Sequence, residues 1–309
     1  MHAIDAATLL GDDAESFAAA LDGGLAVVGP PFAGRETVLA AAADRLDAPR
    51  HSLGPGDDPA LRDPPTVVDG CHHLYRRAVD GFDRLDAFRD RLADVDGPVV
   101  TGWTTHAWEY LAATRGLDRE FPARVRVAPL DAAALGDVLL DGTTRFAPDD
   151  PDESGLFAVR RHELSWRGRR LSVPRPTVDR AYLAAALRDT DPTPRDVVLE
   201  RLAQASGGNL GVAAALWDRA EGEPVRPSDV PTPASDRDLD DDEAFLLRVL
   251  LAKERAPRRE LAAVVGETAD RVVARLARAG LVTAAEGTVA LDPVGVPVAT
   301  AAVERRQLR

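Results

Sequence analysis

The sequence predicts an α/β protein with a mostly parallel sheet, followed by a helical region and a small C-terminal domain. Four short apolar segments have the length of buried strands: "LAVV" at 25–28, "TVVD" at 66–69, "PVVTGW" at 98–103 and "RVRVA" at 124–128. Helix-like stretches alternate with them, a pattern typical of parallel sheets whose two faces are covered by helices. Beyond residue 178 the pattern changes to helices alone, and it changes again after a Pro-rich stretch.

The length and charge limit the possible classes of protein. A chain of 309 residues exceeds the roughly 250–300 residues that one hydrophobic core supports, so two or three units are expected. A net charge of −13 excludes a chain that coats nucleic acid with its whole surface, although a local basic patch is compatible with it. Asp outnumbers Glu and Lys253 is the only lysine. This composition resembles that of halophilic proteins, and a GC-rich genome would also favour Arg over Lys.

The cysteine content and the hydropathy indicate a cytoplasmic protein. Cys71 is the single cysteine, which excludes an internal disulfide and fits a reducing compartment. The sequence shows no signal-peptide pattern and no apolar run near the roughly 18 residues of a membrane span. We therefore expect no membrane insertion.

The order of the segments gives the predicted domains. Apolar positions at helical spacing precede the stop signal Gly23–Gly24, and the Pro-rich stretch at 141–178 is predicted as a loop or a hairpin insertion. Two helices follow, separated by Gly207, Gly208 and Asn209. The predicted division is an N-terminal helix (1–22), a core (23–178), a helical lid (179–222), a linker (223–239) and a C-terminal domain (240–309).

The C-terminal domain has the pattern of a winged helix-turn-helix. Three amphipathic segments, "DEAFLLRVLLAK", "RRELAAVVG" and "TADRVVARLARAGLV", precede the hairpin-like "TAAEGTVALD". Arg271, Arg275 and Arg278 are spaced four and three apart, so they share one face of the third helix, which could enter a DNA major groove. Arg258 and Arg259 could contact phosphates. Double-stranded DNA is one expected partner. Alternatively, these arginines only form a solvent-exposed face, and the domain binds a protein or a second copy of the chain.

The segment "AVVGPPFAGRETVL" at 26–39 has the layout of a phosphate-binding loop. Gly29, four residues beginning with Pro30, and Gly34 lie between a strand and a helix, where backbone N–H groups can converge on phosphates. The alternative is a plain strand-to-helix turn.

The side chains that should follow this loop are wrong for catalysis. Arg35 and Glu36 stand where a lysine and a hydroxyl are expected, and Thr37 comes one position late. The planar guanidinium of arginine does not replace a compact ammonium. A carboxylate about 4 Å from phosphate charge repels it by about 4 kcal/mol at an effective dielectric near 20.

Polar residues follow two other predicted strands. Asp69 ends one of them, where a carboxylate could accept a hydrogen bond from a Mg²⁺-bound water. Thr101 and Thr104 lie at the end of the next, at the sheet edge where α/β proteins bind ligands. Alternatively, Asp69 is a turn residue and the threonines are structural. No metal site is expected at Cys71–His72–His73, because adjacent helical residues point about 100° apart.

Together the segments resemble AAA+/STAND-type P-loop ATPases over roughly residues 23–220. The similarity rests on "TVVDGCHHLYRRAVDGFDRLDAF", "VVTGWTTHAWEYL", "FPARVRVAPLDAAAL" and "ASGGNLGVAAALW". It implies a P-loop NTPase-like sheet with a helical lid and ATP or ADP with Mg²⁺ as cofactor. It also implies site residues: Gly29, Pro30, Gly34, Arg35, Glu36 and Thr37 in the phosphate loop, Asp69 as Walker B acid, Thr101 or Thr104 as sensor, and Gly208 and Asn209 in the lid turn.

The departures from the family pattern lead to the functional prediction. Hydrolysing relatives commonly carry a glutamate at the position of Gly70, and Arg35 and Glu36 also depart from the pattern. We expect a degenerate nucleotide-binding protein that binds nucleotide weakly or not at all and acts as a regulator or adaptor. Two alternatives stay open: an active ATP-hydrolysing switch that uses Arg35 and Thr37, and a winged-helix DNA-binding regulator whose α/β half is structural.

Overall fold

A computed structural model describes residues 3–58, 61, 63–78, 80–149, 157–166, 169–178, 180–188, 192–233 and 237–306, and only the backbone of residues 157–166, 169–178 and 188. The chain packs as two compact units. The larger comprises Ala3–Pro129, Asn209–Val212 and Pro233–Arg309, and the smaller comprises mainly Leu130–Gly208 and Ala213–Thr232.

A five-stranded sheet forms the centre of the larger unit. Its strand order is β2-β3-β4-β1-β5, and every neighbouring pair is parallel, which confirms the predicted mostly parallel sheet. The carboxyl ends of the strands therefore meet at one edge. The strands are β1 (Gly24–Gly29), β2 (Arg50–Ser52), β3 (Thr66–Asp69), β4 (Val99–Thr104) and β5 (Ala123–Arg126).

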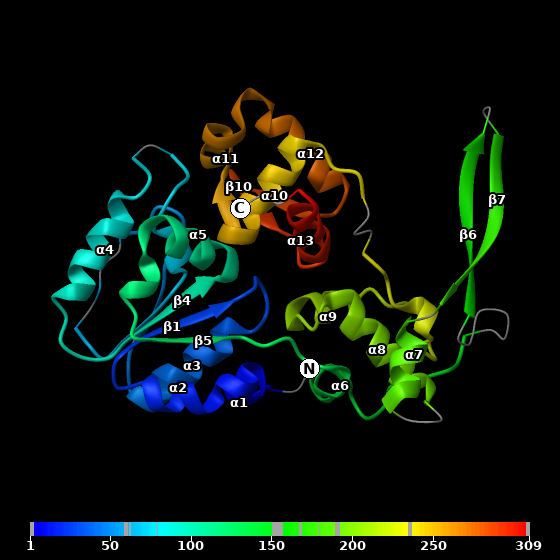
Figure 1. The fold of residues 1–309 in the computed structure, drawn as a ribbon, viewed down its shortest axis with the longest axis horizontal. Helices are drawn as coiled ribbons and strands as arrows, with labels where there is room; N and C mark the ends of the chain where they lie inside the picture. Colours follow the sequence, from blue (N-terminus) through cyan, green and yellow to red (C-terminus); the bar gives the residue numbers. More distant parts are fainter. Residues whose placement is uncertain are drawn as a thin grey trace. The chain divides into compact units, whose positions relative to one another are not determined.

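Helices cover both faces of this sheet. Figure 1 shows α1, α2 and α3 on one side and α5 on the other. Where the sequence predicts an N-terminal helix within residues 1–22, two short helices form, because Gly11 adopts a φ of 52° and interrupts the helix. The elements are α1 (Ala6–Leu10), η1 (Gly11–Asp13), α2 (Ala14–Ala20), α3 (Arg35–Leu46), η2 (Cys71–His73), α4 (Asp83–Ala93), α5 (Thr105–Arg115) and η3 (Leu117–Arg119).

The C-terminal residues pack against this core within the same unit. Helix α10 contacts α5, β4 and η2, and nine of its residues are buried, since other C-terminal helices pack around it as well. The strands form an antiparallel sheet in the order β8-β10-β9. The elements are α10 (Asp241–Lys253), β8 (Arg255–Pro257), α11 (Arg258–Val265), η5 (Gly266–Thr268), α12 (Ala269–Arg278), β9 (Val282–Ala285), β10 (Thr288–Leu291) and α13 (Gly295–Arg305).

The smaller unit is mostly helical and carries a long hairpin. Strands β6 and β7 pair antiparallel within the stretch predicted as a loop or hairpin insertion. Helix α8 begins with a capping box between Thr193 and Asp196. The predicted boundary between core and lid, after residue 178, falls inside this unit. Its elements are α6 (Ala132–Leu139), β6 (Phe157–Trp166), β7 (Arg169–Val178), α7 (Arg180–Arg188), α8 (Pro194–Ser206), η4 (Pro227–Asp229) and most of α9 (Leu210–Trp217).

In the described part of the chain, none of the helices combines the length and apolar character required to cross a bilayer.

Candidate phosphate-loop site

The phosphate loop, residues 29–37, runs from the end of β1 into the first turn of α3 and has a tight backbone. Gly34 is the residue before α3 and adopts a left-handed φ of 97°. A Cβ on Gly34 would lie 2.9 Å from Leu9 Cδ1, and a Cβ on Gly29 would lie 2.9 Å from Val127 Cγ2. Both glycines are therefore required by the backbone path and by close packing. The loop ends at a helix N-terminus, whose first N–H groups have no intrahelical partner.

The side chain of Arg35 is turned into the protein. Its Nε donates to Oδ1 of Asp69 at 3.0 Å, and its Nη2 lies 3.0 Å from Oε1 of Glu254. Arg35 is only 5% exposed. Burial alone would lower the pKa of Arg35, but the carboxylates of Glu254 and Asp69 outweigh burial and raise it. We call these three residues the Arg35 triplet.

Asp69 is held in this arrangement by its neighbours. Its Oδ1 accepts the backbone N–H of Gly70 at 2.7 Å as well as the Arg35 guanidinium. The absence of a side chain at Gly102 makes room for it, because a Cβ there would lie 2.5 Å from the same oxygen. Asp69 thus lies beside the phosphate loop, and its carboxylate is already engaged by a cation of the protein.

Glu254 is the member of the triplet that the sequence prediction missed. It follows α10 directly and adopts a φ of 59°, which is rare for a residue with a side chain. Burial raises the pKa of its carboxyl group, and the Arg35 charge opposes that rise. His72 Nε2 lies 3.8 Å from Oε2 of Glu254. Burial holds the pKa of His72 well below its usual value, so His72 is neutral at pH 7 and forms no ion pair.

The remaining residues of the loop do not join this cluster. Glu36 and Pro30 are exposed. The backbone carbonyl of Glu36 accepts a hydrogen bond from Arg50 Nη1 at 3.1 Å. Thr37 is half-buried, and its backbone N–H donates to the carbonyl of Gly34 at 3.0 Å. Among the described residues, no ion pair or side-chain hydrogen bond joins Thr37 to the Arg35 triplet.

Both sensor candidates use their hydroxyls within the fold. The Thr101 hydroxyl donates to the carbonyl of Leu25 at 3.3 Å and accepts the indole N–H of Trp103 at 2.8 Å. The Thr104 hydroxyl donates to the carbonyl of Ala252 at 2.5 Å and caps α5 by accepting from Ala107 N at 3.3 Å. Neither hydroxyl is bonded to Arg35 or Asp69.

The Gly-Asn turn reaches the phosphate loop through Asn209. Its Nδ2 donates to the carbonyl of Pro31 at 2.8 Å, and its Oδ1 accepts from Val212 N at 3.2 Å. The N–H of Gly211 donates to the carbonyl of Phe32 at 2.9 Å. Gly208 is buried and donates its N–H to the carbonyl of Ala203. The start of α9 is therefore bonded to the backbone of the loop.

The arginines predicted to contact DNA are in different environments. Arg271 and Arg278 are exposed on α12. Arg275 is tied to α10, with Nη2 at 2.5 Å from Asp240 Oδ2 and Nε at 3.1 Å from Glu243 Oε1. Arg258 pairs with Asp270 at 2.8 Å, and Arg259 is exposed on α11. The three arginines of α12 therefore do not form one free basic face.

The cluster Cys71–His72–His73 is buried in the 3₁₀ helix η2. Burial raises the pKa of the Cys71 thiol, which keeps it protonated and unreactive. No group of three or more His, Cys, Asp or Glu side chains with the geometry of a metal site occurs within the residues that the structure describes.

Comparison with models of known protein families gives no match, and comparison with curated protein sequences gives none. Among solved structures, the chain is similar to the RuvB Holliday junction branch migration motor of Thermotoga maritima, with 16% identity and a TM-score of 0.40 over 96% of this chain and 94% of that chain. It is also similar to the Orc1 protein of Aeropyrum pernix in complex with DNA, with 15% identity and a TM-score of 0.37 over 99% and 95%. A third is a closed state of Hsp104 with ATPγS and FITC casein, with 14% identity and a TM-score of 0.39 over 90% and 52%.

Gly70 cannot carry a side chain in this backbone. Its φ is 73°, and a Cβ would lie 2.2 Å from the carbonyl oxygen of Leu53. We expect Gly70→Ala to lower the free energy of unfolding by about 2–3 kcal/mol, from left-handed strain plus overlap with the backbone. Urea denaturation measures the change. Gly280→Ala is the matched control, because Gly280 has a φ of 69° and open space around it. Equal losses in the two variants would contradict the explanation by overlap.

Proposed function

We propose that this chain is a degenerate AAA+/STAND-like P-loop protein that binds nucleotide weakly or not at all and hydrolyses ATP poorly. It acts as a regulator or adaptor through a C-terminal winged-helix domain. The observation that supports this proposal is the Arg35 triplet, in which the cation of the phosphate loop is buried between two carboxylates. The charge of Arg35 is already compensated by these two carboxylates, and the side chain is buried, so little of this cation is available to a phosphate.

The residues present do not fit a Mg²⁺–triphosphate group. Oδ1 of Asp69 already accepts from Arg35 and from the backbone of Gly70. A divalent cation beside Asp69 would face the nearby guanidinium, and like charges repel strongly where burial reduces solvent screening. Gly70 offers no carboxylate to polarise a water, and the Thr37 hydroxyl comes one position late in the loop. These features support a retained fold with little or no hydrolysis.

Calorimetry with ATP and ADP, with and without Mg²⁺, tests the proposal on the full chain. We expect weak or undetectable binding that Mg²⁺ does not strengthen, together with phosphate release at background. Measurements at low and at multimolar salt cover both a mesophilic and a halophilic origin. Turnover above background that disappears in Asp69→Ala would establish the alternative, an active switch that uses Arg35 and Thr37.

A DNA-binding regulator is the second candidate, and the exposed arginines of α12 favour it. The succession of α10, α11 and α12 followed by the β9–β10 hairpin is the arrangement expected of a winged helix-turn-helix. Within the described residues, Arg271 and Arg278 have no carboxylate partner that would neutralise them. Both can therefore contact phosphates or bases.

We expect the double variant Arg271→Gln, Arg278→Gln to weaken binding to duplex fragments. The slope of log affinity against log salt concentration should decrease by the amount that about two phosphate contacts contribute. Arg275 is left intact, because its removal would break its contacts with α10. Arg119→Gln, Arg126→Gln is the control, since it removes the same charge from exposed positions on the core that have no carboxylate partner among the described residues. Equal binding by the two double variants would refute a role for α12 in DNA binding.

A further inference from the structure

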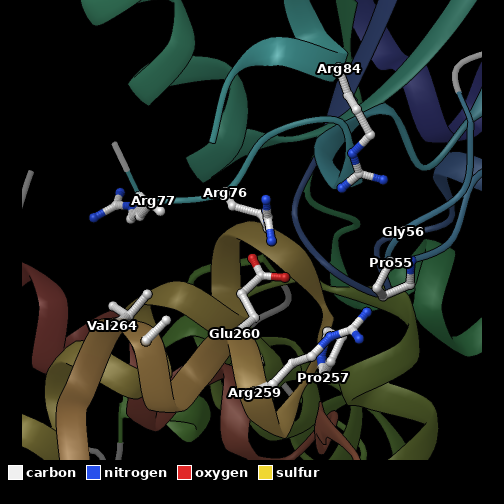
Figure 2. A pocket seen from close by; sticks show the side chains of 11 residues that line it. Pro55, Gly56, Arg76, Arg77, Arg84, Pro257, Arg259, Glu260 and Val264 are labelled. Carbon is white, nitrogen blue, oxygen red and sulfur yellow. The ribbon is translucent and has the colours of Figure 1, made fainter. Parts of the chain in front are cut away.

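A cavity of about 390 Å³ lies between a loop of the core and helix α11. Its lining includes the guanidinium-bearing residues Arg76, Arg84 and Arg259 and the apolar residues Pro55, Pro257 and Val264. Figure 2 shows Arg84 and Arg76 pointing from the core toward α11, with Glu260 and Arg259 on the opposite wall. We call it the arginine cavity. All of its walls belong to the larger unit.

The positive charge of this cavity is not neutralised by the protein. Arg84 donates to the backbone carbonyls of Asp57 at 3.0 Å and His73 at 3.1 Å, and a carbonyl carries no net charge. Arg76 and Arg259 are exposed. As far as the chain is described, none of these three arginines has an ion pair with a carboxylate. Arg77 also lines the cavity, but its guanidinium lies 4.3 Å from the centre of the Tyr110 ring.

The single acid in the lining is already paired. Oε1 of Glu260 lies 3.1 Å from Nζ of Lys253, so this carboxylate does not compensate the arginines. Burial, together with the charges of Arg84 and Arg76, lowers the pKa of Lys253 to about 8, although Glu260 opposes this shift. The arginine cavity thus concentrates positive charge in a chain of net charge −13, and this charge attracts an anion.

We propose that the arginine cavity binds a small molecule that carries a diphosphate group. The guanidinium groups of Arg76, Arg84 and Arg259 supply planar pairs of donors that match phosphate oxygens. The side chains of Pro55, Pro257 and Val264 offer an apolar wall to the organic part of the ligand. The volume is that of a small-ligand pocket. This site is separate from the phosphate loop and does not depend on the function proposed above.

Titration calorimetry of the full chain with inorganic pyrophosphate tests the proposal at low salt, without Mg²⁺. We expect one site per chain, and an affinity reduced at least about tenfold in Arg259→Gln and in Arg84→Gln, since each removes charge-assisted hydrogen bonds. Arg126→Gln serves as the control, because it removes the same charge from an exposed position on β5, outside the cavity. Arg259 is exposed, so its variant is expected to fold, and circular dichroism verifies this.

The proposal fails if pyrophosphate gives no binding heat, if Arg259→Gln retains full affinity, or if Arg126→Gln loses as much affinity as Arg259→Gln. The last result would indicate attraction by overall charge alone. Duplex DNA that binds through Arg259 while pyrophosphate does not bind would overturn the assignment to a small molecule. Weak binding of ATP at the phosphate loop leaves these outcomes distinct, because Arg35 does not line the cavity.

Discussion

Replacing Arg35 with methionine is expected to lower the free energy of unfolding by about 3–5 kcal/mol, the cost of leaving a buried charge without its partner. Methionine has a similar length but no charge, so it leaves the carboxylate of Asp69 without its counter-charge. The Asp69 side chain is only 7% exposed. The carboxylate of Glu254, with a side chain 26% exposed, is better hydrated and contributes less to the loss. Urea denaturation followed by tryptophan fluorescence measures the change, since Trp103 and Trp108 are buried in the core.

Two further variants separate charge from packing. Arg35→Lys keeps the charge but loses the two-pronged contact, and an intermediate loss is expected. Arg35→Met combined with Asp69→Asn removes both charges of the buried pair, and it should recover part of the stability lost in the single variant. A loss below about 1 kcal/mol in Arg35→Met would contradict the importance of the buried pair, because exposed ion pairs contribute about that much.

Stability is expected to fall as the pH drops below 6.5, through buried histidines. Burial lowers the pKa of His73 to about 3 and that of His106 to about 4, and it lowers that of His72 strongly. A histidine with a lowered folded pKa binds its proton more readily in the unfolded chain. Its contribution to the free energy of unfolding is fully present above its ordinary pKa of 6.5. This contribution is lost as the pH falls toward the pKa of the folded state. For His73 the loss is on the order of 2 kcal/mol between pH 6.5 and 5.

Denaturation curves at pH 7, 6 and 5 measure this effect. His73→Gln should flatten the decline relative to the unsubstituted chain, whereas Arg271→Gln should leave its slope unchanged. Other groups act differently: the carboxyl of Asp240 has a lowered pKa through its backbone hydrogen bond with Glu243, so its contribution is lost only below about pH 4. Glu254, with its raised pKa, adds stability as the pH falls. Constant stability from pH 7 to 5 would contradict the role of the histidines.

The elements of the fold were largely predictable because their signals are local. The four predicted strands coincide with β1, β3, β4 and β5 to within a residue or two. Strand β2, Arg50–Ser52, escaped prediction because it is short and lies at the sheet edge, where burial imposes no apolar pattern. Helix α13 was also missed, since "GVPVATAAVER" contains a proline and three valines, which disfavour helix locally, and tertiary packing decides instead.

The sequence was sufficient to predict the backbone of the site but not its side-chain contacts. The spacing of Gly29 and Gly34 predicts the loop, and the end of β3 predicts the place of Asp69. No local pattern indicates that Arg35 turns toward Glu254, more than 200 residues later in the sequence. That contact depends on how α10 packs against the core and on the unusual φ of Glu254, and neither leaves a periodic signal.

The buried position of Lys253 makes it a natural chemical reporter. Lys253 is the only lysine in the sequence, its side chain is 3% exposed, and it lies over the Tyr75 ring with Nζ 4.5 Å from the ring centre. A reagent that acylates lysine amines can reach it only when the end of α10 separates from the core segment around Tyr75. The rate of acylation at this amine therefore measures how often these two parts of the chain separate.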